Sequence, residues 1–186
     1  MNEIIRGLME RRSVRRYTEE QIPEADMQLI VKAGLYAPSA RNTQAWHVTV
    51  LRSRPLIDRV TAETKAATAR MPVNHYKDYV GQAGYTVNFN APTFAIVSVH
   101  PERSFAPEAD AALLLGNMFL AAHSLGAASC WINQLNILSG EEEFRAFTAD
   151  LGVPAEHHIC GCAAFGYAAG PVSAPPRREG AFSFRE

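Results

Sequence analysis

The chain has 186 residues, 47% of them hydrophobic and 20% charged, which is typical of one folded domain with its own hydrophobic core. Its 18 basic and 19 acidic residues leave a formal net charge of -1, and this balance argues against nucleic acid or an anionic membrane as the main partner. The three cysteines do not suggest a disulfide framework, and the sequence shows neither a signal peptide nor an apolar run of about 20 residues that could span a membrane. We therefore expect a single cytoplasmic domain over residues 1–186.

The first half of the chain predicts three helices and one strand from the periodicity of its apolar residues. A short amphipathic helix comes first, then a longer helix that ends at Pro38, an alternating strand and a third helix. These elements span residues 3–10, 22–38, 46–52 and 54–71. Residues 71–92 are irregular and rich in Tyr, Asn and Gly, so we expect them to be part helix and part loop.

The second half predicts three further strands, near residues 94–99, 129–132 and 158–166, and two further helices, over 107–127 and 139–152. In the last helix, Ser139 and Glu142 have the spacing of a capping box. Strands and helices mixed in this order indicate an α+β domain.

Two segments indicate contacts beyond one small domain. The helix over 107–127 is apolar around most of its circumference, so its large side chains cannot all face one sheet, and we expect one side of it to form a subunit interface. Residues 167–186 form an extended tail with too much Pro and Gly for a helix, and Phe182 and Phe184 favour a tail laid over another surface. The apolar residues of the helix are Leu113, Leu114, Leu115, Met118, Phe119, Leu120 and Leu125.

Four arginines, Arg11, Arg12, Arg15 and Arg16, surround Ser13 near the start of the chain. A phosphate dianion that is partly removed from water needs about two charge-assisted partners, and arginine supplies them in a fork geometry. The serine hydroxyl would add a neutral donor. A second interpretation explains the local sequence equally well: arginines in the last turn of a helix favour its dipole and otherwise face solvent.

A second polar segment, "APSARNTQAWHV", lies between the second helix and the first strand. Loops rich in Ser, Asn and Gln are usually turns. Amide and hydroxyl side chains beside a tryptophan also suit a polar planar ligand, so both interpretations stay open here.

Two other groups of polar residues favour structural roles. His157, His158, Cys160 and Cys162 would share one stretch of the last strand, but they lack a second pair of ligands elsewhere, so we expect small buried cysteines and no metal site. We expect alternation to place Cys160 and Cys162 on one face of that strand. The carboxylates at 108 and 110 are expected as charges at a helix N-terminus. No G-x-S-x-G motif supports a hydrolase.

Four stretches in series resemble the FMN-dependent nitroreductase family. They are "RRSVRRY", "APSARNTQAWHV", "DAALLLGNMFLAAHSLGAASCWI", and "GCAAFGY" with the Pro/Arg tail after it; the segment from about 55 to 92 shows no match. The resemblance implies a nitroreductase-like α+β fold with a mixed, mainly antiparallel sheet flanked by helices. It also implies an intertwined homodimer, in which the C-terminal tail crosses to the partner and two FMN sites lie at the interface.

The resemblance assigns the N-terminal polar residues to the cofactor. Arg11 and Ser13 match positions that hold the phosphate and ribityl chain, and Arg12 matches a position beside the pyrimidine edge. Arg15 matches a basic residue near N1 and the C2 carbonyl, where a fixed cation stabilises the reduced flavin.

Further cofactor-binding residues are implied on other segments. The loop that lines the flavin from the partner subunit would contribute Pro38, Ser39, Asn42 and Gln44. The segment whose backbone passes the N5–C4 edge would contain Trp131, Ile132, Asn133 and Gln134, where Gln134 replaces a frequent glycine and leaves the accessible substrate size open. Arg177 or Arg178 would reach the phosphate from the tail, and Asn88 or Asn90 could bind the N3–O2 edge.

The activity implied is that of an NAD(P)H-dependent flavoprotein oxidoreductase. Hydride would pass in a ping-pong cycle from NADH or NADPH through flavin N5 to a small-molecule acceptor, such as a nitroaromatic or a quinone, and no catalytic side chain is required. Two alternatives stay open: another flavin reaction on the same fold, such as reductive dehalogenation or substrate dehydrogenation, and a non-enzymatic role in binding or storing FMN.

Overall fold

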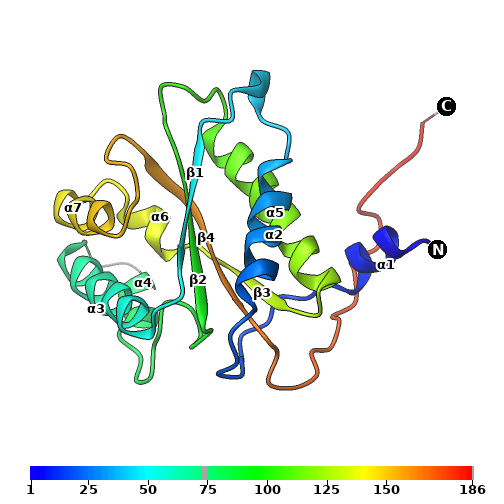
Figure 1. The fold of residues 1–186 in the computed structure, drawn as a ribbon, viewed down its shortest axis with the longest axis horizontal. Helices are drawn as coiled ribbons and strands as arrows, with labels where there is room; N and C mark the ends of the chain where they lie inside the picture. The colour runs from blue at the N-terminus through cyan, green and yellow to red at the C-terminus, as the bar shows by residue number, and fades with distance from the viewer. Residues whose placement is uncertain (73–74, 186) are drawn as a thin grey trace.

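A computed structural model describes residues 1–72 and 75–185 and shows a sheet between two layers of helices (Figure 1). The strands are β1 (Trp46–Leu51), β2 (Thr93–Val99), β3 (Ala128–Ile132) and β4 (His158–Gly166), in the spatial order β1-β2-β4-β3. All three strand pairings are antiparallel. The four predicted strands are therefore confirmed to within about one residue, because alternating or continuous apolar runs of this length suit pleated, half-buried or buried strands.

One face of the sheet is covered by α2 (Glu24–Leu35) and α5 (Pro107–Ser124), and the other by α3 (Arg54–Arg70), α6 (Gln134–Leu138) and α7 (Glu142–Asp150) (Figure 1). The short helix α4 (His75–Val80) packs on α3, whereas α1 (Glu3–Glu10) lies at the periphery against α5. The helix α6 was not predicted, because five residues are too few to show a helical period.

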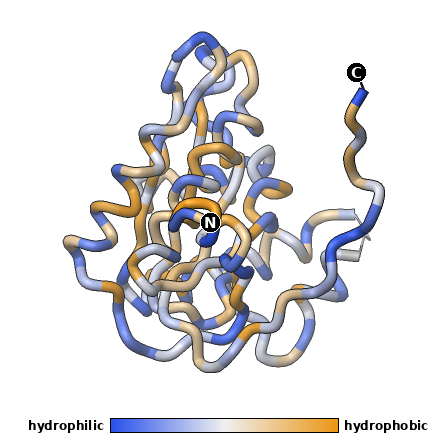
Figure 2. Tube along the Cα trace, turned by 90° about the vertical axis from the view of Figure 1, so that its right-hand side faces the viewer, coloured by the Kyte–Doolittle hydropathy of each residue, from blue (hydrophilic) through white to orange (hydrophobic). Residues whose placement is uncertain are grey.

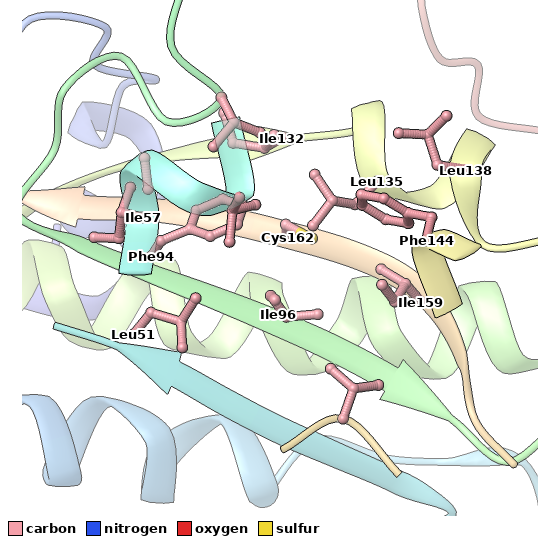
Figure 3. Close-up of a cluster of buried hydrophobic side chains, with 14 of the residues drawn as sticks. Leu51, Ile57, Phe94, Ile96, Ile132, Leu135, Leu138, Phe144, Ile159 and Cys162 are labelled. Carbon is pink, nitrogen blue, oxygen red and sulfur yellow. The ribbon is translucent and has the colours of Figure 1, made fainter. Parts of the chain in front are cut away.

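The side chains of the two sheet faces build two separate cores. On the α3/α6/α7 face, Phe94, Ile96 and Cys162 pack against Ile57 and Phe144 (Figure 3). On the other face, Ala95, Val97 and Phe165 pack against α2 and α5. Strand β2 is buried along its whole length, which explains its continuous apolar sequence.

The apolar circumference of α5 is used on two sides within the chain. Leu114, Leu115 and Met118 are fully buried between the sheet and α2. The helices α2 and α5 approach closely at Gly34, where a Cβ atom would lie 2.6 Å from Cγ of Met118. The sequence analysis considered only the sheet and missed α2 as a second packing partner of α5. One apolar side chain of α5, Leu113, is still 47% exposed.

A register shift in the pairing of β2 with β4 corrects one expectation about the cysteines. The shift lies between Val97 and Ser98, opposite Gly161 and Ile159, and it inserts Cys160 as an extra residue. Cys160 therefore joins the α2/α5 core while Cys162 joins the other, so the two do not share a face. Burial raises the pKa of Cys160 to about 11 and the pKa of Cys162 well above its usual value, which keeps both thiols protonated at neutral pH.

The helix caps show a second difference. The carboxylate of Glu141, not the Ser139 hydroxyl, caps α7 by accepting the N–H of Phe144 at 2.7 Å. The Ser139 hydroxyl instead accepts the N–H of Ile159 at 2.9 Å and so connects the turn between α6 and α7 to β4. The Ser139 hydroxyl therefore binds a residue distant in sequence and not the first turn of its own helix.

The C-terminal tail is exposed from Ala168 to Arg185. Its start is bonded to the N-terminal segment, where Ala169 donates its N–H to the carbonyl of Arg16 at 3.0 Å, and its end runs apart from the body of the chain (Figures 1 and 2). Phe182 and Phe184 are 79% and 89% exposed, and their ring centres lie 5.6 Å apart. Neither ring is buried against its own chain, so the surface predicted to receive this tail is not provided by the described residues. Among the same residues, no helix has both the length and the apolar character needed to cross a membrane.

Candidate functional site

The segment that carries the arginine cluster lies across the ends of β3 and β4. Val14 donates its backbone N–H to the carbonyl of Ser129 at 3.0 Å, and Ser13 forms a parallel bridge with the same residue. Farther along, the N–H of Thr18 binds the carbonyl of Tyr167 at 2.9 Å. These bonds hold the backbone of the segment against the sheet, so the backbone from which its side chains extend is fixed.

Two of the arginines lie close enough to β3 for their charges to act on Cys130, although each contacts a different aromatic ring. The guanidinium carbon of Arg11 lies 5.8 Å from the centre of the Phe119 ring, and that of Arg15 lies 5.9 Å from the centre of the Phe89 ring. Burial raises the pKa of the Cys130 thiol, while the positive charges of Arg15 and Arg11 act against that increase. Both charges therefore act on the same point of the strand.

The charges of these arginines are not neutralised by acidic side chains. Within residues 1–72 and 75–185, Arg11, Arg12, Arg15 and Arg16 form no ion pair. Arg12 turns back to the end of α1, where its guanidinium donates to the carbonyls of Met9 at 2.7 Å and Arg11 at 2.6 Å. Arg12 thus serves a helix end, as the second interpretation of the cluster predicted, whereas Arg11 and Arg15 remain available to an anion.

Two clefts open beside Arg15. A cleft of about 520 Å³ lies between Ser13–Arg16 and Ala169–Val172, within the size range of small-molecule sites. A second, of about 220 Å³, is lined by Arg15, Tyr79, Tyr85 and Phe89 among others. Arg15 lines both clefts and so lies at the centre of the candidate site.

The loop beside the second cleft has an unusual backbone. Phe89 and Asn90 both have left-handed φ angles, +56° and +59°, a region that non-glycine residues enter rarely. The buried side chain of Asn88 donates to the carbonyl of Ala91 at 2.6 Å, and Oδ1 of Asn90 accepts from Arg54 at 2.9 Å. Asn88 is thus occupied inside the loop, whereas Asn90 lines the cleft.

The segment after Cys130 continues from the same strand. Ile132 is buried in the core, while Trp131 is half-buried and its indole N–H donates to Oδ1 of Asn133 at 3.4 Å. The tryptophan fits closely against the sheet, because a Cβ atom at Gly161 would lie 2.7 Å from Cη2 of Trp131. Gln134 begins α6 directly after this turn.

Comparison with known proteins identifies the family. Residues 8–167 match the model of the Nitroreductase family. The chain belongs to the nitroreductase family. A curated relative from Archaeoglobus fulgidus, named putative NADH dehydrogenase/NAD(P)H nitroreductase, is 29% identical over 171 residues, which cover 90% of this chain and 86% of that protein.

Solved nitroreductase structures share the fold over the whole chain. A nitroreductase with bound FMN from Bacteroides fragilis is 36% identical, with a TM-score of 0.94 and 100% of both chains covered. Another with bound FMN, from Desulfitobacterium hafniense, is 25% identical, with a TM-score of 0.89 and 100% of both chains covered. The predicted nitroreductase-like α+β fold is confirmed.

The predicted site residues of this nitroreductase-family chain fall into three groups in space. Arg11, Ser13 and Arg15 lie beside β3, the strand that leads to Trp131–Gln134. The loop with Pro38, Ser39, Asn42 and Gln44 is bonded to Asp110 near the start of α5, whereas Arg11 lies at Phe119. About 13 Å of helix separates Asp110 from Phe119, at about 1.5 Å per residue. Arg177 and Arg178 lie on the exposed tail.

Sequence reasoning missed two contributors to these surroundings. Phe89 packs under Arg15, although the sequence analysis found no family motif in its segment; the flanking asparagines in "NFN" were the available signal. Asp110 was predicted as a charge at a helix N-terminus and does lie in the first turn of α5, but the sequence did not show that it is buried and hydrogen-bonded. The described residues contain no group of three or more His, Cys, Asp or Glu side chains that could hold a metal ion.

Proposed function

We propose that this chain is an FMN-dependent oxidoreductase that uses NADH or NADPH to reduce a small electrophilic acceptor, such as a nitroaromatic or a quinone. The observation that carries the proposal is the guanidinium group of Arg15, which has no acidic partner among the described residues and lines, together with Ser13, a cleft of about 520 Å³. Family membership and the FMN bound in two solved neighbours, 36% and 25% identical to this chain, support the choice of cofactor.

The residues beside the cleft fit a flavin nucleotide in charge and donor chemistry. Arg11 and the Ser13 hydroxyl would hold the phosphate and ribityl chain, since a guanidinium fork and a neutral donor complement a phosphate group. Arg15 would lie at the pyrimidine edge. Its guanidinium is held over the ring of Phe89, which limits its conformations before any ligand binds.

In the proposed mechanism the protein binds and orients the cofactor and stabilises the charge that develops during the reaction. FMN supplies the redox chemistry when bound, since it takes up two electrons as hydride from NAD(P)H and gives them to the acceptor. The positive charge of Arg15 would favour that reduction by stabilising the negative charge that develops beside it. The turn from Trp131 to Gln134 would place backbone donors at the opposite edge of the ring system.

We also propose that the active form is a homodimer with one FMN site at each end of its interface. The predicted flavin-lining loop 38–44 and Arg11 lie at different ends of α5, so a second copy could supply the loop to the arginine cluster. Exposed apolar residues support this arrangement: Ile4, Ile5, Leu8 and Met9 are exposed on α1, which packs on α5, and Leu113 is exposed on α5 itself. A tail that crosses to the partner would bury Phe182 and Phe184.

A direct experiment is purification of the protein followed by anaerobic reduction with NADH or NADPH. We expect a yellow protein with one FMN per chain, bleached by a nicotinamide and reoxidised by a nitroaromatic or quinone. A flavin-loaded protein that no nicotinamide reduces would favour FMN storage. Reduction without turnover of these acceptors, but with turnover of a halogenated or a dehydrogenatable substrate, would favour another flavin reaction. A dimer that cannot be reconstituted with FMN would refute the proposal.

A further inference from the structure

The loop between α2 and β1 has a backbone that its own residues do not favour. Arg41, Asn42 and Gln44 have φ angles of +54°, +55° and +48°. In this left-handed region the Cβ atom of an L-residue approaches the following carbonyl oxygen, so residues other than glycine enter it at a cost. Such a conformation persists only where surrounding contacts fix it. The question is which contacts fix this loop.

Asp110, on α5, supplies the buried contacts. Its side chain is 2% exposed. Oδ1 accepts the backbone N–H of Ala40 at 2.8 Å, and Oδ2 accepts the hydroxyl of Ser104 at 2.7 Å. The Ser104 oxygen in turn accepts the N–H of Ala106 at 3.1 Å. One carboxylate therefore joins loop 38–44 to the turn that precedes α5.

A second, exposed layer of contacts follows the same path. The guanidinium carbon of Arg41 lies 4.2 Å from the centre of the Phe105 ring. Within the loop, the hydroxyl of Ser39 accepts the N–H of Gln44 at 3.0 Å. The N–H of Asn42 also donates to the carbonyl of Ser39 at 2.8 Å, but these contacts are local to the loop. The charge-assisted bonds of Asp110 are therefore the strongest connection between the loop and α5.

The chemistry of Asp110 suits this role better than a role as a surface charge. A buried carboxylate is costly unless hydrogen bonds satisfy its oxygens. Among the described residues no Lys or Arg forms an ion pair with it, so its two oxygens are directed to Ala40 and Ser104. Both donors belong to loop segments. The bonds therefore fix loop geometry and do not merely strengthen the packing of α5.

We propose that Asp110 is a positioning residue, which holds loop 38–44 in its left-handed conformation and so presents Pro38, Ser39 and Asn42 to the flavin. This inference rests on the proposed function, in which that loop lines the FMN site of the partner subunit. Asp110 itself touches no flavin. Its effect on cofactor affinity passes through the backbone N–H of Ala40.

The test compares Asp110→Ala, Asp110→Asn and the matched control Glu108→Ala, which removes an exposed carboxylate from the same turn of α5. Two quantities are measured: the Kd of FMN by quenching of flavin fluorescence, and the rate of tryptic cleavage after Arg41 by mass spectrometry. Cleavage after Lys65, exposed on α3, reports global unfolding.

For Asp110→Ala we expect cleavage after Arg41 to accelerate by about tenfold and the Kd of FMN to rise by about tenfold, each equivalent to about 1.4 kcal/mol, while cleavage after Lys65 keeps the parent rate. Asp110→Asn keeps an oxygen for the N–H of Ala40, and its amide can donate to the Ser104 hydroxyl. Its cleavage rate after Arg41 and its Kd for FMN should therefore stay close to those of the parent protein. Glu108→Ala should match the parent protein. If Asp110→Ala does not fold, Ser104→Ala, which removes one of the two bonds, should show the same pattern with smaller changes.

Three outcomes would overturn the inference. Parent-like cleavage after Arg41 in both Asp110→Ala and Ser104→Ala would show that the carboxylate does not hold the loop. Faster cleavage with an unchanged Kd would show that the loop does not act on the flavin, while the proposed function stands if Arg11→Ala still weakens FMN. A parent protein that binds no FMN would refute both proposals together.

Discussion

The positive charge of Arg15 lies over the ring of Phe89, with 5.9 Å between the guanidinium carbon and the ring centre. Phe89 reaches this position because its backbone is left-handed, at a φ of +56°, in a loop secured by Asn88. The contact joins the arginine cluster near the N-terminus to the segment before β2, where the sequence alone showed no recognisable motif. It holds one cation between two clefts.

Replacement of Arg15 tests the electrostatic role proposed for it. We expect Arg15→Ala to retain part of its flavin, because Arg11 and Ser13 remain, but to be reduced by NAD(P)H about 10- to 100-fold more slowly, since a charge that stabilises the transition state is lost. Anaerobic stopped-flow absorbance of the flavin measures this half-reaction. Arg103→Ala, which removes an exposed arginine from the turn before α5, is the control. An unchanged half-reaction rate would refute the role.

Association through the exposed face of α5 gives a second prediction. Leu113→Glu places a charge on that face and should convert the dimer to monomers with a loss of FMN affinity, because burial of an unpaired charge opposes association. Leu29→Glu makes the same change at an exposed leucine on α2 and should leave the assembly intact. Light scattering after gel filtration measures the mass. A dimeric, flavin-loaded Leu113→Glu protein would contradict the proposed interface.

The stability of the apoprotein should decrease in mild acid because of His157. Burial, together with the nearby His100 and His47, lowers the pKa of His157 from 6.5, although a hydrogen bond with Ser98 and the charge of Glu156 act in the opposite direction. The unfolded chain then binds more protons than the folded chain below about pH 6.5, so the free energy of unfolding falls as the pH drops through the lowered pKa. Urea unfolding at several pH values measures the slope.

His157→Gln removes this titration and should flatten the dependence between about pH 7 and pH 5. The neighbouring His158→Gln, at the exposed first residue of β4, serves as the control and should keep the parent slope. If both variants follow the parent curve, His157 is not the group responsible.

The close packing of Trp131 can be tested at Gly161. A Cβ atom there would lie 2.7 Å from Cη2 of Trp131 and 2.8 Å from Cδ1 of Leu115, so Gly161→Ala should destabilise the fold by about 1–3 kcal/mol. Gly140→Ala meets no atom within 4 Å and should change stability by less than about 0.5 kcal/mol. Urea unfolding of the two apoproteins makes the comparison. Equal stability of both variants would mean that the sheet adjusts to the added methyl group.

Local sequence was sufficient for the strands and the longer helices, because these depend on neighbours in the chain. Apolar periodicity located β2 and β4, and the density of arginines around Ser13 indicated an anion site. It did not show that Arg12 bonds back to the carbonyl of Met9 and so differs from Arg11 and Arg15. That difference depends on how α1 ends against the rest of the chain.

What the sequence determined by itself is therefore the strand and helix pattern, the family and the candidate cation cluster. Only the tertiary structure decided which residues share a face or a contact. The bulge at Cys160 placed its side chain on the face opposite to that of Cys162. The packing of two loops on α5 made Asp110, predicted only as a charge at a helix N-terminus, a buried hydrogen-bond acceptor. Both results depend on segments distant in sequence, whose backbone groups must find partners once water is excluded, and no local pattern encodes that requirement.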